Sequence, residues 1–344
     1  MQLTSVVAAA LLARHAAAQN MLRFACSQLV VDRVDPIVNP GMQYTPHLHQ
    51  IVGGNSFNIT MDPDNHDLTA STCTSCSFKE DKSNYWTAVM FFQHKNGSYK
   101  RVPQVGNGGP QGQLVNKGGL DVYYIPSGKV TAFKKGFRMI AGSAANTDPK
   151  KVSASNICHR CWKSTDDNQF TGGAPCTGSD TVDIPADTSC KMIRQTLIFP
   201  TCWDGKNLDS PDHQSHVAYS SGSGATGGGN CPATHPVKLP QIMYEVMWNI
   251  STFLDKSTWA AKPFVYSMNI GGAAAHGDYV FGWEGDTLQK AMDNRCNLNN
   301  DCTAAGIHKQ QPDVYNACTK KQQAPETVDG WLQALPMGEM ARRA

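Results

Sequence analysis

Residues 241–248, Gln-Ile-Met-Tyr-Glu-Val-Met-Trp (QIMYEVMW), are the stretch of this chain that best indicates its fold. Branched and aromatic side chains of this kind favour a β-strand, and residues 242–248 have the usual length of one. One carboxylate, Glu245, interrupts the apolar side chains. Side chains alternate between the two faces of a strand, so Glu245 either faces solvent or is buried and must be paired. A buried carboxylate often has a shifted pKa and a functional role.

Similar runs recur along the chain between turn-forming residues. They are residues 85–92, 121–125, 137–141, 195–199, 217–219 and 264–268. Helical patterning is scarce before residue 284, and 30 Gly and 19 Pro imply many turns. Near the C-terminus, residues 286–294 and 327–335 have helical spacing, the second with Thr327 as a candidate N-cap. We predict a mainly β fold: an antiparallel, jelly-roll-like sandwich with long loops, at 106–119 and 220–229 among others, several disulfides and a short helical C-terminal part.

The N-terminus has features of an export signal. An apolar run covers residues 1–13, and Ala16, Ala17 and Ala18 form a small-residue cleavage site, although Arg14 follows the apolar run instead of preceding it. We expect a signal peptide at 1–18, a β-rich domain at 19–285 and a partly helical, Cys-containing extension at 286–344. No stretch has the length of a membrane helix. The mature protein is therefore expected to be secreted and extracellular.

The cysteines agree with export. An even count of 12 in an exported chain predicts disulfides, to which the C-x-x-C pairs at 73/76 and 158/161 should contribute through distant partners. A zinc site of four thiolates is the alternative for these pairs. Sequons at Asn58, Asn96 and Asn249 predict a glycoprotein. A net charge of +2, with 17% charged residues, provides no field for nucleic acid or an anionic membrane. We expect a monomer.

Six of the 11 histidines fall in short motifs: PHLHQI with His47 and His49, SPDHQSHVAY with His213 and His216, CPATHPVKLPQ with His235, and AHGDYVFGW with His276. A His-x-His pair on an extended strand presents both rings on one face. Two imidazoles on one face suit a metal ion or a proton-transfer site. We predict that one divalent metal ion is held by His47, His49, His213 and His216. The alternative is that these histidines are structural.

Carboxylates lie close to these motifs in the sequence. Asp212 precedes His213, Asp35 lies twelve residues before His47, and Asp278 follows His276. Such a set supports three chemistries: metal binding, glycosidic hydrolysis by paired carboxylates, and a lyase reaction with a His or Tyr base such as Tyr219 or Tyr279. The predicted catalytic residues are Asp212, His213, His216, His47 and His49, with Glu245 or Asp35 as the acid/base. The predicted substrate-binding residues are Trp203, His235, His276 and Asp278.

Long motifs of the chain resemble a large family of secreted fungal proteins catalogued only as a domain of unknown function. The motifs are RVDPIVNPGMQYTPHLHQIVGG, FPTCWDGKNLDSPDHQSHVAY, CPATHPVKLPQIMYEVMW and HGDYVFGW, and the resemblance covers about residues 24–283. It implies an extracellular fungal protein and no settled activity. The Cys-containing segment 295–322 departs from the pattern.

Three functions follow from these observations. The first is a carbohydrate-active enzyme, a hydrolase or lyase acting on a cell-wall polysaccharide. The second is a non-catalytic protein that binds a wall glycan. The third is a metal-dependent oxidoreductase that uses the same histidines. A copper monooxygenase is the least compatible form of the third, because such enzymes use an N-terminal His and the expected mature terminus is Gln19.

Overall fold

The computed structural model describes residues 21–107, 116–163, 174–222, 228–297 and 302–337. In chain order the strands of this part are β1 Leu22–Cys26, β2 Val30–Asp32, β3 His49–Gly53, β4 Asn84–Ala88, β5 Met90–His94, β6 Tyr99–Arg101, β7 Gln104–Val105, β8 Leu120–Ile125, β9 Arg138–Gly142, β10 Ile157–Trp162, β11 Met192–Ile198, β12 Cys202–Trp203, β13 Val217–Ala218, β14 Val237–Lys238, β15 Gln241–Asn249, β16 Trp259–Tyr266, β17 His276–Val280 and β18 Trp331–Leu332. The α-helices are α1 Thr287–Asp293 and α2 Pro312–Ala317.

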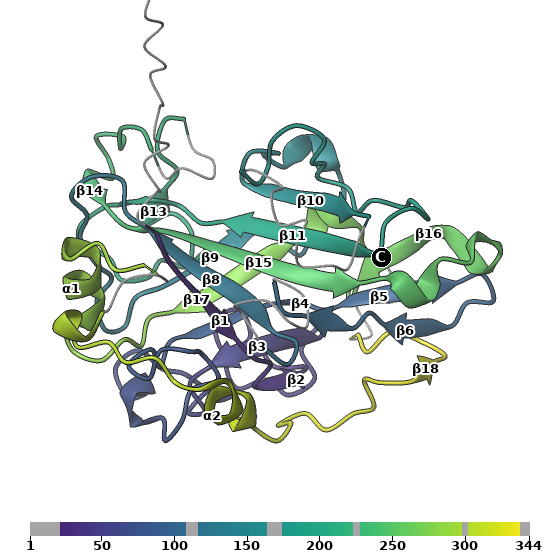
Figure 1. Cartoon of the computed structure of the whole chain (residues 1–344), viewed down its shortest axis with the longest axis horizontal. Coiled ribbons are helices and arrows are strands. Elements are labelled where there is room, and N and C mark those ends of the chain that lie inside the picture. The colour runs from purple at the N-terminus through teal and green to yellow at the C-terminus, as the bar shows by residue number, and fades with distance from the viewer. Residues whose placement is uncertain (1–20, 108–115, 164–173, 223–227, 298–301, 338–344) are drawn as a thin grey trace, which may run out of the picture.

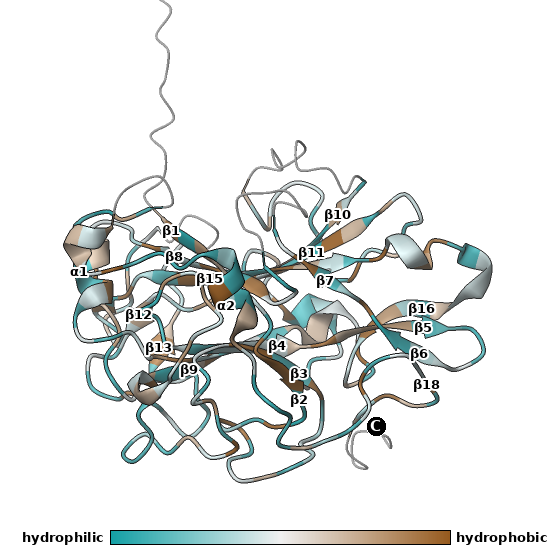
Figure 2. Ribbon diagram, turned by 60° about the horizontal axis from the view of Figure 1, so that its bottom comes forward, coloured by the Kyte–Doolittle hydropathy of each residue, from teal (hydrophilic) through white to brown (hydrophobic). Residues whose placement is uncertain are grey.

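The strands form two layers that face each other across one core (Figures 1 and 2). The first layer has the strand order β1-β8-β15-β11-β10, with β7 also paired to β15. The second layer contains a sheet of order β2-β3-β4-β17-β9 and a sheet of order β16-β5-β6-β18. A small sheet, β13-β12-β14, lies beside them. Every strand pair within the described ranges is antiparallel, which confirms the predicted mainly β, antiparallel fold.

The stretch QIMYEVMW forms β15, in the middle of the first layer between β8 and β11. Its alternate side chains Ile242, Tyr244, Val246 and Trp248 are buried in the main core. Glu245 therefore points to the outer face of this layer. It is nevertheless only 4% exposed, so the solvent-facing alternative for this carboxylate does not hold.

The predicted strand at 85–92 is two strands, β4 and β5, which belong to different sheets of the second layer. The chain changes partners at Val89, whose N–H donates to the Leu48 carbonyl at 3.2 Å and whose carbonyl accepts from Ser267 at 2.9 Å. Leu48 lies between the two motif histidines His47 and His49. This break therefore fixes the backbone between the two rings.

The outer face of the second layer is covered by the chain on either side of β3, residues 33–47 and 54–70, which we call the cover segment. Its side chains Val34, Ile37, Phe57 and Leu68 form a second apolar cluster with sheet residues such as Trp86. Because this face is covered by protein instead of solvent, polar side chains on it must find partners within the structure.

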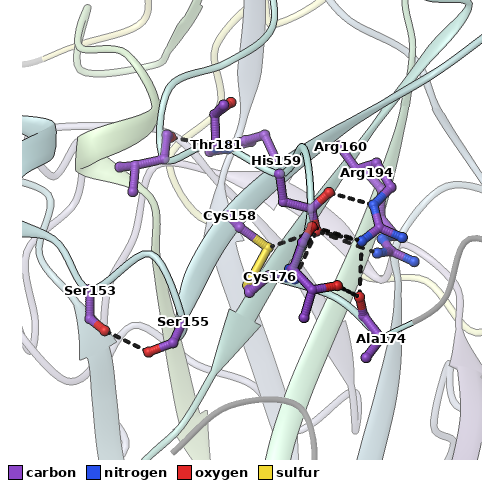
Figure 3. Close-up of a disulfide and its surroundings, with 12 residues drawn as sticks. Ser153, Ser155, Cys158, His159, Arg160, Ala174, Cys176, Thr181 and Arg194 are labelled. Carbon is purple, nitrogen blue, oxygen red and sulfur yellow. Dashed lines mark hydrogen bonds and ion pairs between the residues drawn. A yellow bond between two sulfur atoms is a disulfide. The ribbon is translucent and has the colours of Figure 1, made fainter.

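Five disulfides account for ten of the 12 cysteines: Cys26–Cys76, Cys73–Cys318, Cys158–Cys176, Cys161–Cys190 and Cys202–Cys231. Each cysteine of the two C-x-x-C pairs is bridged to a partner outside its own pair, as predicted, which removes the thiolate zinc alternative. Figure 3 shows the Cys158–Cys176 bridge with Arg160 and Arg194 beside it. Cys296 and Cys302 are both buried.

The C-terminal segment departs from one prediction. The helix at 286–294 is present as α1, but the helix predicted at 327–335 is wrong, because Trp331 and Leu332 pair with β6 as the short strand β18. Gly330 has a φ of +83°, which a right-handed helix does not allow. Thr327 is therefore not an N-cap.

No helix in the described ranges is long and apolar enough to cross a membrane. The predicted signal peptide lies outside these ranges, as do residues 108–115 and 223–227 of the two predicted loops.

Candidate metal centre

Three of the six motif histidines meet on the outer face of the second layer. One ring nitrogen from each of His47, His49 and His276 can be chosen so that all lie within 4.8 Å of one another. His49 begins β3, His276 begins β17, and β4 runs between these strands. On β4, Ala88 pairs with His49 of β3. The residue before it, Thr87, pairs with Gly277 of β17, which directly follows His276. A small side chain therefore separates the two rings across the sheet.

Backbone carbonyls orient two of the rings. His49 Nδ1 lies 3.2 Å from the Val34 carbonyl, and His276 Nδ1 lies 2.9 Å from the Ala274 carbonyl. A carbonyl can only accept, so each Nδ1 carries the proton and each Nε2 carries a lone pair. His47 Nε2 and His276 Nε2 are 3.0 Å apart. Fixing the tautomer of an imidazole through its other nitrogen is how proteins orient histidine ligands of metals.

A carboxylate lies beside the rings. Asp278 is two residues beyond His276 on β17, so both side chains project from the same face of the sheet. Its Oδ2 is 4.0 Å from His276 Nε2, which is too long for a hydrogen bond. Both carboxylate oxygens of Asp278, and also His49 Nε2, are buried without a hydrogen-bond partner among the described residues. These three buried acceptor atoms thus have no donor in the described structure.

The second carboxylate is Asp35, in the cover segment. It is 3% exposed, and its Oδ1 accepts hydrogen bonds from the backbone N–H groups of Ile37 and Val38, both at 3.1 Å. Burial raises its pKa to about 6. Burial, and then the charge of Asp35, raise the pKa of Asp278 well above its usual range. The two carboxylates therefore lie close enough to repel one another.

Burial also lowers the pKa of all three histidines. Repulsion from His49 and His276 lowers the pKa of His47 further, and repulsion from His276 lowers that of His49 further. Neutral imidazole is the form that binds metals. The site thus offers neutral nitrogen donors and buried carboxylate oxygens, and no cationic side chain is hydrogen-bonded to them in the described part of the chain. Such a donor set suits one divalent metal ion, with zinc, manganese, iron and copper all compatible.

The three histidines of the cluster are all buried. His47 is the most exposed of the three histidines, at 8%. The chain between Asp35 and His47 carries three of the exposed large apolar side chains, Val38, Met42 and Tyr44. An exposed apolar patch of this kind often marks a binding surface.

His213 borders the cluster without joining it. Its charge lowers the pKa of Asp35, and its Nδ1 hydrogen-bonds Asp209 at 2.7 Å. Its carbonyl accepts from Ile140, the β9 residue that pairs with Asp278. The φ of His213 is +56°, an uncommon value for a residue with a side chain. The backbone is therefore held in a strained conformation that places this ring beside Asp35.

Other predicted site residues make hydrogen bonds that stabilise the segment after β12, within residues 204–222 and 228–238. His216 is buried, and its two ring nitrogens contact Ser210 Oγ at 2.8 Å and the Arg138 carbonyl at 2.9 Å. The ring of His235 contacts the Ser215 carbonyl at 3.0 Å. The structure places neither ring in the cluster.

Two further predicted residues also act locally. Asp212 is exposed and caps the turn, and hydrogen bonds led by the Ser215 N–H lower its pKa below its usual range. Trp203 is 4% exposed, and its indole N–H donates to the Asn207 carbonyl at 2.6 Å. Trp203 is thus a residue of the main core in this structure.

Glu245 lies across the core from the cluster, on the outer face of the first layer. Tyr123 and Asn107 donate hydrogen bonds to it, and Arg194 lies 3.3 Å from its carboxylate. It pairs in register with Asp121 of β8, whose pKa burial raises to about 8. The structure therefore does not bring Glu245 together with Asp35.

The sequence analysis missed two contributors to the cluster, the carbonyls of Val34 and Ala274. Both are backbone groups, so no residue type in the sequence could have marked them. In the sequence, only the position of Ala274, two residues before His276, could have pointed to one of these carbonyls.

Comparison with known proteins gives one match. The family model described as "Domain of unknown function (DUF1996)" matches residues 35–283, a range that contains every histidine and carboxylate of the cluster. No curated protein and no solved structure matches the chain.

Proposed function

The chain thus belongs to the DUF1996 family, and from that premise we propose that it is a secreted, metal-dependent enzyme that acts on a cell-wall polysaccharide. His47, His49, His276 and Asp278 are the proposed ligands of one divalent ion. The observation that carries the proposal is the convergence of the three histidines, with His49 Nε2 and both oxygens of the neighbouring Asp278 buried without donors in the described structure. Acceptors left in this way cost stability in any protein, and a cation removes that cost.

The chemistry follows from the neighbours of the ligands. A divalent ion held by nitrogen and oxygen donors polarises a sugar oxygen or activates a water molecule. Asp35 is held by two backbone N–H groups next to Asp278, with a pKa of about 6, and is the proposed acid/base. His213 lies on its far side and stabilises its charged form. This division of roles fits a hydrolase or a lyase.

The substrate class rests on other observations. Export is expected from the N-terminal sequence, and two of the sequon residues, Asn58 and Asn96, are exposed where glycans would need them. Tyr44, between Asp35 and His47 in the chain, is 44% exposed with Arg33 over its ring at 5.1 Å, and flat rings commonly stack on sugars. A polysaccharide of the cell wall is a substrate that a secreted enzyme meets.

Metal binding is the first test. The full chain is purified, stripped with a chelator and titrated with Zn²⁺, Mn²⁺, Cu²⁺ and Fe²⁺, with metal content read by mass spectrometry. We expect one equivalent to bind. His49→Asn and His276→Asn should each weaken binding by more than about a hundredfold, beyond the loss typical of residues that only orient ligands. Asn retains a donor at the position of Nδ1, so the bonds to Val34 and Ala274 survive and the variants should fold.

The matched control is His235→Asn, which alters a motif histidine outside the cluster and should leave metal content unchanged. Activity is then screened on wall polysaccharides by reducing ends and unsaturated products, with stripped and reloaded protein. The proposal fails if the wild type binds no metal, or if the stripped protein is fully active. Activity that requires a reductant and oxygen would identify an oxidoreductase instead.

A further inference from the structure

A pocket of about 570 Å³ lies at the end of the second layer where β9 begins and β17 ends. It lies between the 3₁₀ turn Leu68–Ala70, the start of β9 and helix α1. Arg138 lines it and pairs across the sheet with Val280, two residues along β17 from Asp278. Two residues of a strand span about 7 Å, so the pocket begins about that far from the metal centre.

Arg138 is a buried cation with an unused donor. Its side chain is 6% exposed, and its Nε has no hydrogen-bond partner among the described residues. Asp209 Oδ2 lies 3.8 Å from this Nε, too far for a hydrogen bond, and the charges of Asp209 and Asp62 both act on the guanidinium. A buried guanidinium nitrogen without a partner is costly, and an anionic oxygen in the pocket would remove that cost.

His66 supplies a second unused group. Its Nε2 is buried without a partner in the described structure, and its ring hydrogen-bonds the Ser56 backbone through the other nitrogen. Burial, and then the charge of Arg138, lower the pKa of His66, so the ring is neutral and Nε2 is an acceptor. The pocket therefore presents one charged donor and one neutral acceptor.

The other charges of the lining are largely compensated. Asp67 pairs with Lys135 at 2.9 Å, and Asp286 pairs with Lys290 at 2.8 Å. Lys134 lies over the ring of Trp203 at 5.1 Å. The remaining walls include Leu68, Phe133, Phe281 and Trp283. Among the lining cations, Arg138 thus has carboxylates near it but no hydrogen bond to its Nε in the described structure.

We propose that this pocket binds a carboxylate-bearing sugar unit of an acidic polysaccharide, with Arg138 Nε donating to the carboxylate and His66 Nε2 accepting from a hydroxyl group. A ligand with a carboxylate and a hydroxyl group can bond both Arg138 Nε and His66 Nε2. Inorganic phosphate is suited to Arg138 Nε, and a neutral sugar is suited to His66 Nε2. The volume accommodates a sugar ring, and the apolar walls can pack on its faces. As an assignment of substrate class to the metal-dependent enzyme, this inference rests on the proposed function.

Calorimetry with the full chain tests it. The probes are trimers of galacturonate and glucuronate, a neutral cello-trimer and inorganic phosphate, each titrated at two salt concentrations. We expect a uronate trimer to bind at least about tenfold more tightly than the neutral trimer, since a hydrogen bond to a charged group is worth that much. Arg138→Gln and His66→Phe should each weaken uronate binding by about tenfold or more. Arg138→Lys, which keeps the charge, serves as a second variant if Arg138→Gln fails to fold.

The matched control is Arg101→Gln, which alters a salt-bridged arginine of β6 outside the pocket and should bind uronate like the wild type. Equal affinity for the acidic and neutral trimers overturns the inference, as does unchanged uronate binding in both pocket variants. Binding of phosphate as tight as that of uronate also overturns it. Metal content is measured in every variant. Uronate binding by a chain that holds no metal would reject the proposed enzyme while leaving the pocket assignment in place.

Discussion

At the scale of single residues, the buried carboxylates of this protein divide into two kinds. Asp81 is fully buried and partnered, because Tyr85 donates its hydroxyl at 2.6 Å and the Ser83 N–H donates at 3.0 Å. Asp278 is equally buried, but neither of its oxygens has a donor in the described structure. Burial costs both residues stability, but only Asp278 is left as a site for something outside the chain.

The partnered carboxylate predicts a dependence of stability on pH. Burial raises the pKa of Asp81 from 3.8 to about 7. The folded state keeps the proton up to that pH, whereas the unfolded chain releases it near 3.8, so the free energy of unfolding should fall as the pH rises between these values. Asp81→Asn should flatten this slope, because the amide does not titrate. Urea unfolding across this pH range measures it.

The control for Asp81 is Asp255→Asn. Asp255 is exposed, and hydrogen bonds from Ser257 lower its pKa. Its effect on the free energy of unfolding is therefore complete below the pH range in which Asp81 titrates. This variant should retain the wild-type slope. A slope that persists unchanged in Asp81→Asn would contradict the account.

At the scale of elements, the C-terminal chain fastens the cover segment. The N–H of Ala324 donates to Asp32 at 3.0 Å, Glu326 pairs with Arg33 at 2.8 Å, and the side chain of Gln323 accepts from Ile59 at 2.9 Å. Cys318 belongs to the apolar cluster beneath that segment and is bridged to Cys73. The C-terminal chain therefore supports the elements that hold Val34 and Asp35 against the sheet.

This arrangement predicts that two disulfides differ in their effect on the metal centre. Replacing Cys73 and Cys318 together with Ser should lower the free energy of unfolding by about 2–5 kcal/mol and also weaken metal binding, because the cover segment loosens. Replacing Cys158 and Cys176, on the first layer, should lower stability and leave metal affinity unchanged. Thermal melts and metal titrations of both double variants distinguish these outcomes. Equal metal affinity in the two variants would show that the cover segment does not support the site.

At the scale of the whole molecule, the proposed ion connects distant parts of the chain. His47 and His49 lie at the start of β3, and His276 and Asp278 lie in β17, on the far side of β4. A ligand that binds only the folded state stabilises it in proportion to its saturation, by about 2.7 kcal/mol at a hundred times Kd. Metal binding should thus raise the free energy of unfolding of the whole protein.

Metal should therefore raise the Tm of the wild type and not that of Asp278→Asn. In the stripped protein at neutral pH, Asp278→Asn should be more stable than the wild type by about 0.5–2 kcal/mol, because functional residues are often held at a cost to stability. Scanning calorimetry with chelator and with metal measures both effects. Asp212→Asn, a surface cap, is the control and should be less stable than the wild type in both conditions. A stripped Asp278→Asn that melts below the wild type would argue for a structural carboxylate.

The sequence by itself determined the class of fold and much of what the sheet faces carry. Alternation of apolar side chains is a local property, so it predicted strands β8, β9, β11 and β15 without knowledge of their partners. Residue types also marked His47, His49, His276, Asp35 and Asp278 as chemically unusual, because histidines and carboxylates among apolar neighbours are costly unless used. The helix predicted at 327–335 was wrong because the helical spacing there includes Gly330, whose φ of +83° a right-handed helix does not allow.

Only the tertiary structure decided which marked residues meet. Five residues of the cluster come together because β3 and β17 flank β4. The partners in β4 and β17, such as Thr87 and Gly277, are about 190 residues apart, and no local pattern encodes that pairing. The same packing separated Glu245 onto the opposite layer and gave His216 two partners of its own. It also created the Arg138 pocket from residues that look ordinary in sequence. Whether a polar side chain is satisfied depends on donors brought from elsewhere in the chain, and that is a property of the fold alone.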